Sequence, residues 1–241
     1  MFRYKGRPWY INASRDRLAK VNRGFAERTR KNMLVLDAGA GRGPYRKMFK
    51  HARYEAADFA QLSTAYTKLD YVCSLVDIPV KDARFDRILF NQVLEHIDDP
   101  PAVLKELHRV LKPGGQILCT VPLFYQEHQQ PYDYFRYTKF ALQKLFTDTG
   151  FENVRIEWLE GYFGTVSYQF HLMSRWLPDA SRFDPGWRGV YLGPMLWGTR
   201  TMAGILSGAF ARAELRWKYT EKGMPKNYVV RARRPKSRLS R

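Results

Sequence analysis

Cysteine is scarce in this chain: the 241 residues include two, Cys73 and Cys119. Both fall in predicted core strands, so we expect packed thiols in a reducing compartment rather than a disulfide. No cysteine and histidine residues stand at the spacings typical of zinc sites, so no metal site is expected. The basic N-terminus has no apolar run of the kind that a signal peptide requires, and we therefore expect a cytoplasmic protein.

Acidic residues are also few: 23 Asp and Glu stand against 41 Lys and Arg, which gives a net charge of +18. The excess lies on two flanks, because residues 1–31 hold ten basic and two acidic residues, and residues 212–241 hold eleven and two. The stretch between them is nearly neutral. This pattern predicts attraction to a polyanion, which could be an anionic membrane surface, a nucleic acid or a phosphorylated substrate. For residues 235–241 we expect a solvated tail.

The most informative motif is Val35–Gly43, which reads VLDAGAGRG. An apolar run that ends in Asp37 predicts a buried strand, and Pro44–Phe49 can open a helix beyond it. Glycines at three alternate positions allow a sharp turn and a close approach of the backbone to a ligand. A glycine-rich turn between a strand and a helix binds nucleotides in open α/β sheets.

Further segments follow in the order typical of such a sheet. Tyr54–Phe59 predicts a second strand, and its Asp58 stands where doubly wound sheets place the carboxylate that binds ribose hydroxyls. An Ile-Pro turn at Asp77–Pro79 comes next, then a predicted strand and the sequence VLEH within Phe85–Ile97. The sequence RVLKPGG then leads into a predicted central strand, Gln116–Pro122.

This ordered series resembles the type 11 branch of the class I S-adenosylmethionine (SAM) methyltransferases over about residues 33–160. The resemblance implies an α/β fold: a Rossmann-like seven-stranded sheet, mostly parallel with one antiparallel strand, and with helices on both faces. It also implies SAM as the cofactor and methyl transfer as the reaction. The cofactor-binding residues that it implies are Asp37, Gly39, Ala40, Gly41, Gly43, Asp58, Ser74, Leu75 and Asn91.

One position departs from the family pattern. Where the family usually carries an Asp that accepts from the adenine amino group, this chain has Ser74. A hydroxyl can accept the same hydrogen bond, and Asp70 and Asp77 stand close enough in sequence to replace it. Asn91, at the end of its predicted strand, is expected either at the cofactor or in ordering the backbone.

The segment Pro122–Thr138 follows the central strand, so we expect it at the carboxyl edge of the sheet, where ligands bind. It combines a histidine, acids, an arginine and aromatic residues. A structural alternative is a loop locked by an Arg–Asp pair and by tyrosines. The candidates for the substrate side are His128, Tyr132 and Arg136, and the candidate catalytic residues are His128, Asp133 and Arg136.

Two points about this loop and its surroundings stay open. His128 or Asp133 is the candidate base for a hydroxyl acceptor, whereas His96, in VLEH, could either transfer protons or shape the cofactor pocket. The loop also resembles a stretch of uncharacterised type 11 methyltransferases found with glycan-biosynthesis enzymes, which favours a glycan acceptor.

The end of the sheet carries an insertion. Strands Asn153–Leu159 and Asn227–Ala232 are expected to pair antiparallel, with about 65 residues between them, far more than a hairpin needs. Residues 189–211 carry one charge, Arg200, but Pro194 and interior glycines argue against a membrane span. Two interpretations stay open: a patch that lies in the membrane interface, or a helical lid over the substrate pocket.

The domains expected from these segments follow the chain in order. Within the N-terminal flank, Ile11–Lys31 predicts a helix that either covers the cofactor pocket or simply packs on the sheet. The expected divisions are a basic helical flank (1–31), a SAM-binding core (32–160), an aromatic-rich insertion (161–226), a final core strand (227–234) and a basic tail (235–241).

The sequence therefore predicts a SAM-dependent methyltransferase that acts on a hydroxyl or similar nucleophile of a glycan, lipid-linked or other small-molecule acceptor. A nucleic-acid methyltransferase is favoured by the charge, but the core lacks an Asn/Asp-Pro-Pro-Tyr/Phe motif or a Cys nucleophile. A non-catalytic SAM-fold binding protein is the other alternative, and the intact glycine turn with Asp58 argues against it.

Overall fold

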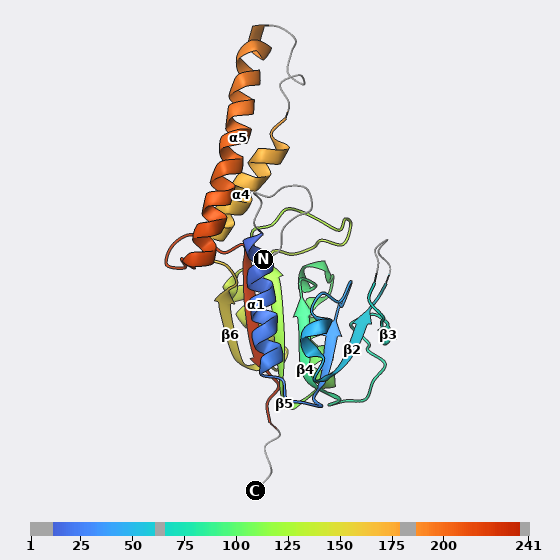
Figure 1. Ribbon diagram of the computed structural model, residues 1–241. Coiled ribbons are helices and arrows are strands. Elements are labelled where there is room, and N and C mark those ends of the chain that lie inside the picture. The colour runs from blue at the N-terminus through green and yellow to red at the C-terminus, as the bar shows by residue number, and fades with distance from the viewer. Residues whose placement is uncertain (1–11, 61–65, 179–186, 237–241) are drawn as a thin grey trace. The chain divides into compact units, whose positions relative to one another are not determined.

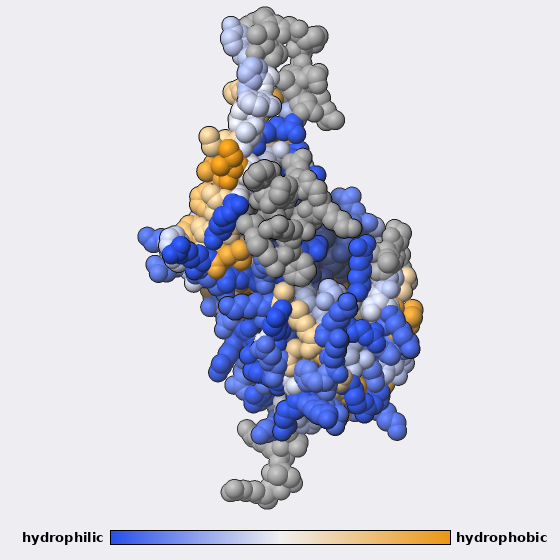
Figure 2. All heavy atoms as spheres, viewed as in Figure 1, coloured by the Kyte–Doolittle hydropathy of each residue, from blue (hydrophilic) through white to orange (hydrophobic). Residues whose placement is uncertain are grey.

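The computed structural model describes residues 12–60, 66–178 and 187–236. Residues 1–11 and 237–241, which hold part of the predicted basic flanks, lie outside the described residues. The chain divides into two compact units: a sheet unit, Leu18–Leu159 with the chain from Asn227 onward, and a helical unit, which includes residues 12–17 and 160–226. In the view of Figure 2 the sheet unit is mainly hydrophilic, whereas apolar side chains cover part of the helical unit.

Seven strands form one sheet in the order β3-β2-β1-β4-β5-β7-β6 (Figure 1). Strands β1 to β5 pair in parallel, and β7 runs antiparallel to both of its neighbours. The fold that the resemblance implied is thus confirmed. The strands are β1 (Leu34–Ala38), β2 (Arg53–Asp58), β3 (Tyr71–Val72), β4 (Phe85–Asn91), β5 (Leu111–Pro122), β6 (Glu152–Trp158) and β7 (Asn227–Arg233).

Two α-helices of the sheet unit begin at polar caps. Asp99 accepts a hydrogen bond from the Ala102 N–H at 3.1 Å, and Thr138 accepts from the Ala141 N–H at 3.2 Å. The helices are α1 (Ala13–Glu27), which crosses the division between the units, α2 (Pro100–Val110) and α3 (Lys139–Asp148), with short 3₁₀ helices η1 (Arg46–Phe49) and η2 (Leu94–His96).

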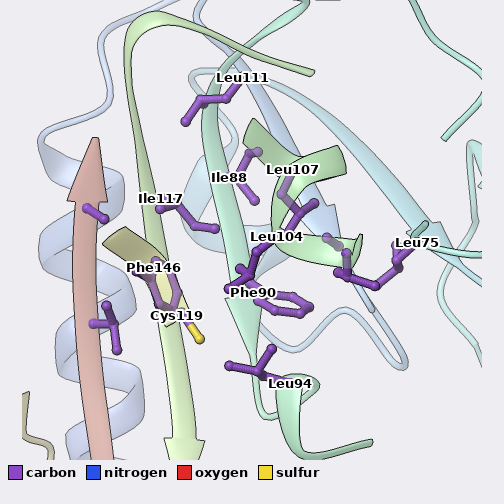
Figure 3. Close-up of a cluster of buried hydrophobic side chains, with 14 of the residues drawn as sticks. Leu75, Ile88, Phe90, Leu94, Leu104, Leu107, Leu111, Ile117, Cys119 and Phe146 are labelled. Atoms are coloured by element: carbon purple, nitrogen blue, oxygen red, sulfur yellow. The ribbon is translucent and has the colours of Figure 1, made fainter. Parts of the chain in front are cut away.

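Helices cover both faces of the sheet because successive strand residues point to opposite sides. On one face, buried strand residues pack with α2 and α3, as Figure 3 shows for Ile88, Phe90, Ile117, Leu104 and Phe146. The intervening residues Val35, Leu89 and Leu118 pack on the other face with Phe25 of α1 and Phe49 of η1. Burial on both sides explains why these strands read as continuous apolar runs.

Two local predictions were wrong in detail. The expected helix at Pro44–Phe49 is a four-residue 3₁₀ helix that begins at Arg46, since the positive φ of Gly43 delays its start. Strand β5 begins at Leu111 rather than Gln116. The Gly114 N–H donates to the Arg234 carbonyl, and the Arg234 N–H donates to the Gly115 carbonyl, so the Pro-Gly-Gly segment pairs with the chain beyond β7.

The insertion folds into two long helices, α4 (Tyr162–Trp176) and α5 (Trp187–Arg216). Ser167 and Ser207 join them by donating to each other's carbonyls at 2.8 and 2.9 Å. The buried carboxylate of Glu214 accepts from the Gly161 and Gly164 N–H groups. Pro194 lies inside α5 without ending it. Among the described helices, none combines the length and apolar character needed to cross a membrane.

Candidate active site

The glycine turn follows β1 directly. Gly39, Gly41 and Gly43 have φ values of +73°, +49° and +60°, in the left-handed region that favours glycine. The N–H groups of Gly39 and Ala40 donate to the Ala57 carbonyl at 2.9 and 3.1 Å, which ties the turn to the end of β2. The turn is therefore a fixed loop at the carboxyl edge of the sheet.

Space around the three glycines differs. A Cβ on Gly39 would lie 2.4 Å from the Val93 side chain, and one on Gly43 would lie 2.9 Å from Thr67. A Cβ on Gly41 would meet nothing within 4 Å. Gly39 is thus needed for packing and for its φ, whereas Gly41 faces open space.

Asp58, at the end of β2, caps the same turn. One carboxylate oxygen accepts from the Gly41 N–H at 2.9 Å and the other accepts from the Ala60 N–H at 3.2 Å. Each oxygen has two lone pairs, so the carboxylate can accept further hydrogen bonds. The structure therefore brings Asp58, the residue predicted to bind the ribose hydroxyls, together with the glycine turn.

Asp37 is buried in β1, with 3% of its surface exposed. The Tyr54 hydroxyl donates to its carboxylate. Burial raises the pKa of Asp37 to about 6, against the lowering effect of the Tyr54 hydrogen bond. Asp37 thus lies near the end of β1, two residues before the first glycine of the turn.

The residues predicted on the adenine side differ from one another in burial and in hydrogen bonding. Leu75 is buried in the core that packs against α2, while the Ser74 hydroxyl accepts a long 3.5 Å bond from the Val76 N–H. Asp70 accepts from the Ala56 N–H at 2.9 Å, so its carboxylate serves strand β2. Ser74 and Asp77 remain exposed.

Asn91 lies in a polar network rather than at an open surface. Its amide nitrogen donates to the Asn22 side chain at 2.9 Å, and its amide oxygen accepts from the Thr120 hydroxyl at 2.9 Å. These contacts support the backbone-ordering interpretation, because they join β4 to α1 and β5.

Arg136 ties the loop after β5 together. Its guanidinium donates to both carboxylate oxygens of Asp133 at 2.7 Å and to the carbonyls of Tyr125 and Gln126. This hydrogen bonding lowers the pKa of Asp133, so Asp133 stays ionised and is a weak base. For Arg136 and Asp133 the structural alternative, a locked loop, accounts for the contacts.

His128 and His96 meet on the other side of this loop. Their ring centroids lie 4.6 Å apart. The Tyr132 carbonyl lies 2.5 Å from Nδ1 of His96, and since a carbonyl can only accept, Nδ1 carries the proton. Burial lowers the pKa of His96 and so favours the neutral ring with an unprotonated Nε2.

Glu95 completes this group, and sequence reasoning did not single it out. Its side chain is fully buried, and burial raises its pKa to about 8. Nε2 of His96 lies 3.8 Å from a carboxylate oxygen, beyond hydrogen-bond distance. Within the part of the chain that the structure describes, both carboxylate oxygens lack a hydrogen-bond partner. The signal available in the sequence was the position of this acidic residue between Leu94 and His96 in the VLEH motif.

The glycine turn and the loop after β5 are neighbours. Phe59, directly after Asp58, makes an edge-to-face contact with Tyr132, with ring centroids 6.1 Å apart. Val93, two residues before Glu95, packs against Gly39. The arrangement can hold one ligand at the turn and present histidines to a second ligand beside it.

Comparison with known proteins gives one family. The family model described as a methyltransferase domain matches residues 10–156. A ubiquinone/menaquinone biosynthesis C-methyltransferase from Desulfotalea psychrophila is 31% identical over 97 residues, which cover 35% of this chain and 39% of that protein. The chain therefore spans well under half the length of this curated relative.

Solved structures share the fold. A SAM-dependent methyltransferase from Archaeoglobus fulgidus aligns with a TM-score of 0.54 and 17% identity, covering 91% of this chain and 94% of that one. A phosphoethanolamine N-methyltransferase from Haemonchus contortus, solved with phosphomonomethylethanolamine and S-adenosylhomocysteine, aligns with a TM-score of 0.55 and 13% identity over 92% of this chain and 53% of that one.

These structural likenesses establish the fold, and the family match establishes the relationship because it covers more than half of the chain. The chain belongs to the methyltransferase domain family, and its resemblance to the class I SAM-dependent methyltransferases is confirmed.

Proposed function

We propose that the chain is a SAM-dependent methyltransferase whose acceptor is a small or lipid-linked molecule. The observation that carries this proposal is the meeting of two loops at one edge of the sheet, through the contact of Phe59 with Tyr132. In the proposal the glycine turn holds the cofactor and the loop after β5 faces the acceptor. Holding the two reactants side by side is the main catalytic contribution that this reaction needs.

The residues of the turn fit SAM. Gly41 has a left-handed backbone and open space where a side chain would lie, so a ligand can approach its backbone closely. Asp58 keeps acceptor capacity for ribose hydroxyls beyond its two backbone bonds. When bound, SAM supplies a methyl group that its positively charged sulfur already activates.

A hydroxyl acceptor must also lose its proton, which calls for a base. We assign that role to the histidine pair, His128 and His96. His96 presents a neutral, unprotonated Nε2, because Tyr132 fixes its other nitrogen as the donor. Asp133 is less suited, since Arg136 holds its carboxylate in the ionised form.

The helical unit favours an acceptor that is lipid-linked. Tyr191, Met195, Met202 and Ile205 recur at spacings that place them on one stripe of α5, and all four are exposed. Basic residues follow toward and beyond the end of the helix, at Arg212, Arg216, Lys218 and Lys222. An apolar stripe with adjoining bases is typical of helices that lie on anionic membrane surfaces. The similar protein from Desulfotalea acts in ubiquinone/menaquinone biosynthesis, which points the same way. The proposal includes a glycan as the part of such an acceptor that is methylated.

The test is to incubate the purified protein with SAM that carries a labelled methyl group and with separate lipid, polar and RNA fractions of a bacterial extract. Label in a lipid or small-molecule product, strongly reduced with Asp58→Ala, is the expected result. Label in RNA would favour the nucleic-acid alternative. A protein that fails to bind SAM in calorimetry would overturn the proposal.

A further inference from the structure

Three side chains outside the glycine turn converge on one point. Glu95 and His96 come from η2 and His128 from the loop after β5, and each offers a ligand atom within 4.8 Å of the other two. Both Glu95 carboxylate oxygens, Nε2 of His96 and Nδ1 of His128 are buried and make no hydrogen bond to the described residues.

Ordinary packing does not account for this cluster. A buried polar atom without a partner is costly, whereas an apolar side chain of similar shape at the same place is nearly neutral. Natural structures pair almost all such atoms, so several unpaired atoms at one point call for an explanation. Glu95 is the strongest case, because its side chain is fully buried.

The surroundings hold the histidines as metal ligands are usually held. Histidine ligands commonly donate their second ring nitrogen to a carbonyl or a carboxylate, which orients the ring. His96 Nδ1 donates to the Tyr132 carbonyl at 2.5 Å, so that its Nε2 lone pair is available on the side of Glu95. His128 is positioned differently: its backbone N–H donates to the Asp133 carboxylate at 2.8 Å, and its unpaired Nδ1 lies 3.3 Å from the same carboxylate without a hydrogen bond. Arg136 fixes Asp133 in that place.

We propose that Glu95, His96 and His128 bind a divalent transition-metal ion, and that Zn²⁺ matches the donor set best. Two histidines and one glutamate form a known catalytic zinc set, which leaves a position open for another ligand. Ligands of tetrahedral zinc lie about 3.4 Å apart. Glu95 and His96 are 3.8 Å apart, so small rotations of the side chains suffice. Glu95 and His96 come from η2, whereas His128 comes from the loop after β5, so no spacing typical of a metal motif joins all three.

The ion has a use in the methyl transfer, and this part of the inference rests on the proposed function. The cluster adjoins Tyr132, which contacts Phe59 beside Asp58. With an ion bound, the two histidines would be its ligands and would no longer act as the base. The ion would instead lower the pKa of a hydroxyl bound in its open position, so that the hydroxyl releases its proton to solvent at neutral pH and becomes a better nucleophile. The acceptor would then be oxygen-bearing, such as a sugar, a phenol or a hydroquinone.

The experiment measures metal binding itself. Tag-free, full-length protein is stripped with a chelator and titrated with ZnCl₂ in calorimetry, and Co²⁺ binding is followed by its absorption spectrum. We expect one ion per chain and a Co²⁺ spectrum of low coordination number. Glu95→Gln and His128→Ala should each weaken Zn²⁺ binding at least tenfold. The matched control is His108→Ala, which removes a half-buried histidine that contacts Phe151 outside the cluster.

The outcomes separate this inference from the proposed function. SAM binding is measured on every variant, and its retention shows that the fold and the cofactor site survive. His128 lies on a loop and is partly exposed, so its variant keeps the test valid if Glu95→Gln fails to fold. Failure of the wild-type protein to bind a stoichiometric ion would overturn the metal site, as would equal Zn²⁺ affinity in His128→Ala and wild type. Binding of Mg²⁺ but not Zn²⁺ would contradict it too, and none of these results bears on SAM.

Discussion

The glycine turn and the histidine cluster lie at the same edge of one sheet, but they differ in whether their buried polar groups are hydrogen-bonded. At the turn, Asp58 meets two backbone N–H groups and Asp37 meets the Tyr54 hydroxyl. At the cluster, Glu95 is buried deeper than either and has no hydrogen-bond partner among the described residues. A site whose polar atoms are already hydrogen-bonded is preformed. Buried atoms without hydrogen bonds lower the stability of the folded protein, and a ligand that pairs with them can restore it. Under the proposed function, the cofactor side is therefore hydrogen-bonded before SAM binds, and the acceptor side is not.

The strongest test of a preformed turn is the pair Gly39→Ala and Gly41→Ala. Gly39→Ala should lower the free energy of unfolding by about 2–5 kcal/mol, because it adds overpacking against Val93 to left-handed strain. Gly41→Ala adds no clash and should cost about 1–2 kcal/mol, from the backbone alone. Urea unfolding of both variants without SAM measures the difference. Equal losses would show that packing at Gly39 is looser than the structure indicates.

Asp37 gives a pH test of the same region. Burial raises its pKa in the folded protein to about 6, above the unfolded value of 3.8. Between these values the unfolded chain releases a proton that the folded protein keeps, so stability falls as the pH rises from about 4 to 6. A shift of about two pKa units corresponds to about 3 kcal/mol.

Asp37→Asn should remove this pH dependence, since the amide oxygen still accepts from Tyr54 but cannot ionise. The variant should gain stability relative to wild type as the pH rises from 4 to 6, with a constant difference above 6. Thermal or urea unfolding across that range measures it. Asp148→Asn, an exposed carboxylate on α3, is the control. A difference that does not change with pH would contradict the raised pKa.

Asp58→Ala sharpens the comparison from the ligand's side. Loss of charge-assisted hydrogen bonds to ribose should weaken SAM binding by about 1.5–3 kcal/mol, roughly 10- to 150-fold. Calorimetry measures the affinity, and circular dichroism checks that the turn still folds without its carboxylate cap. Unchanged affinity in a folded Asp58→Ala protein would remove Asp58 from the cofactor site.

A smaller effect is expected on the helical unit, which exposes apolar groups that the sheet unit mostly buries. Ile205→Ser should weaken binding to anionic vesicles by about 1 kcal/mol, because one apolar side chain inserts partway. Phe140→Ser is the matched control: Phe140 is 82% exposed, but it lies on α3 of the sheet unit. Vesicle sedimentation at two salt concentrations measures both variants. Equal losses in the two variants, or no binding by wild type, would contradict the membrane interpretation of the helix pair.

The sequence anticipated most of the sheet unit, for identifiable reasons. Strands that are buried on both faces appear in the sequence as apolar runs, and glycines with positive φ mark turns beyond some of them. The bounds of β1, β2, β4 and β7 could therefore be predicted to within a residue or two. The start of β5 could not be predicted in this way, because the sequence Pro113–Gly115 is typical of a turn. In the structure this segment is extended by backbone hydrogen bonds to Arg234, more than 100 residues later in the chain. The sequence around Pro113–Gly115 does not predict a pairing with Arg234.

The sequence by itself determined the family, the fold class and the chemistry of the glycine turn, because these depend on short-range periodicity and on residues a few positions apart. Only the tertiary structure decided which polar groups are satisfied. It placed Asn91 between Asn22 and Thr120, and it brought His128 to Glu95. Burial and hydrogen bonding are properties of neighbours in space, and these neighbours come from different loops and strands.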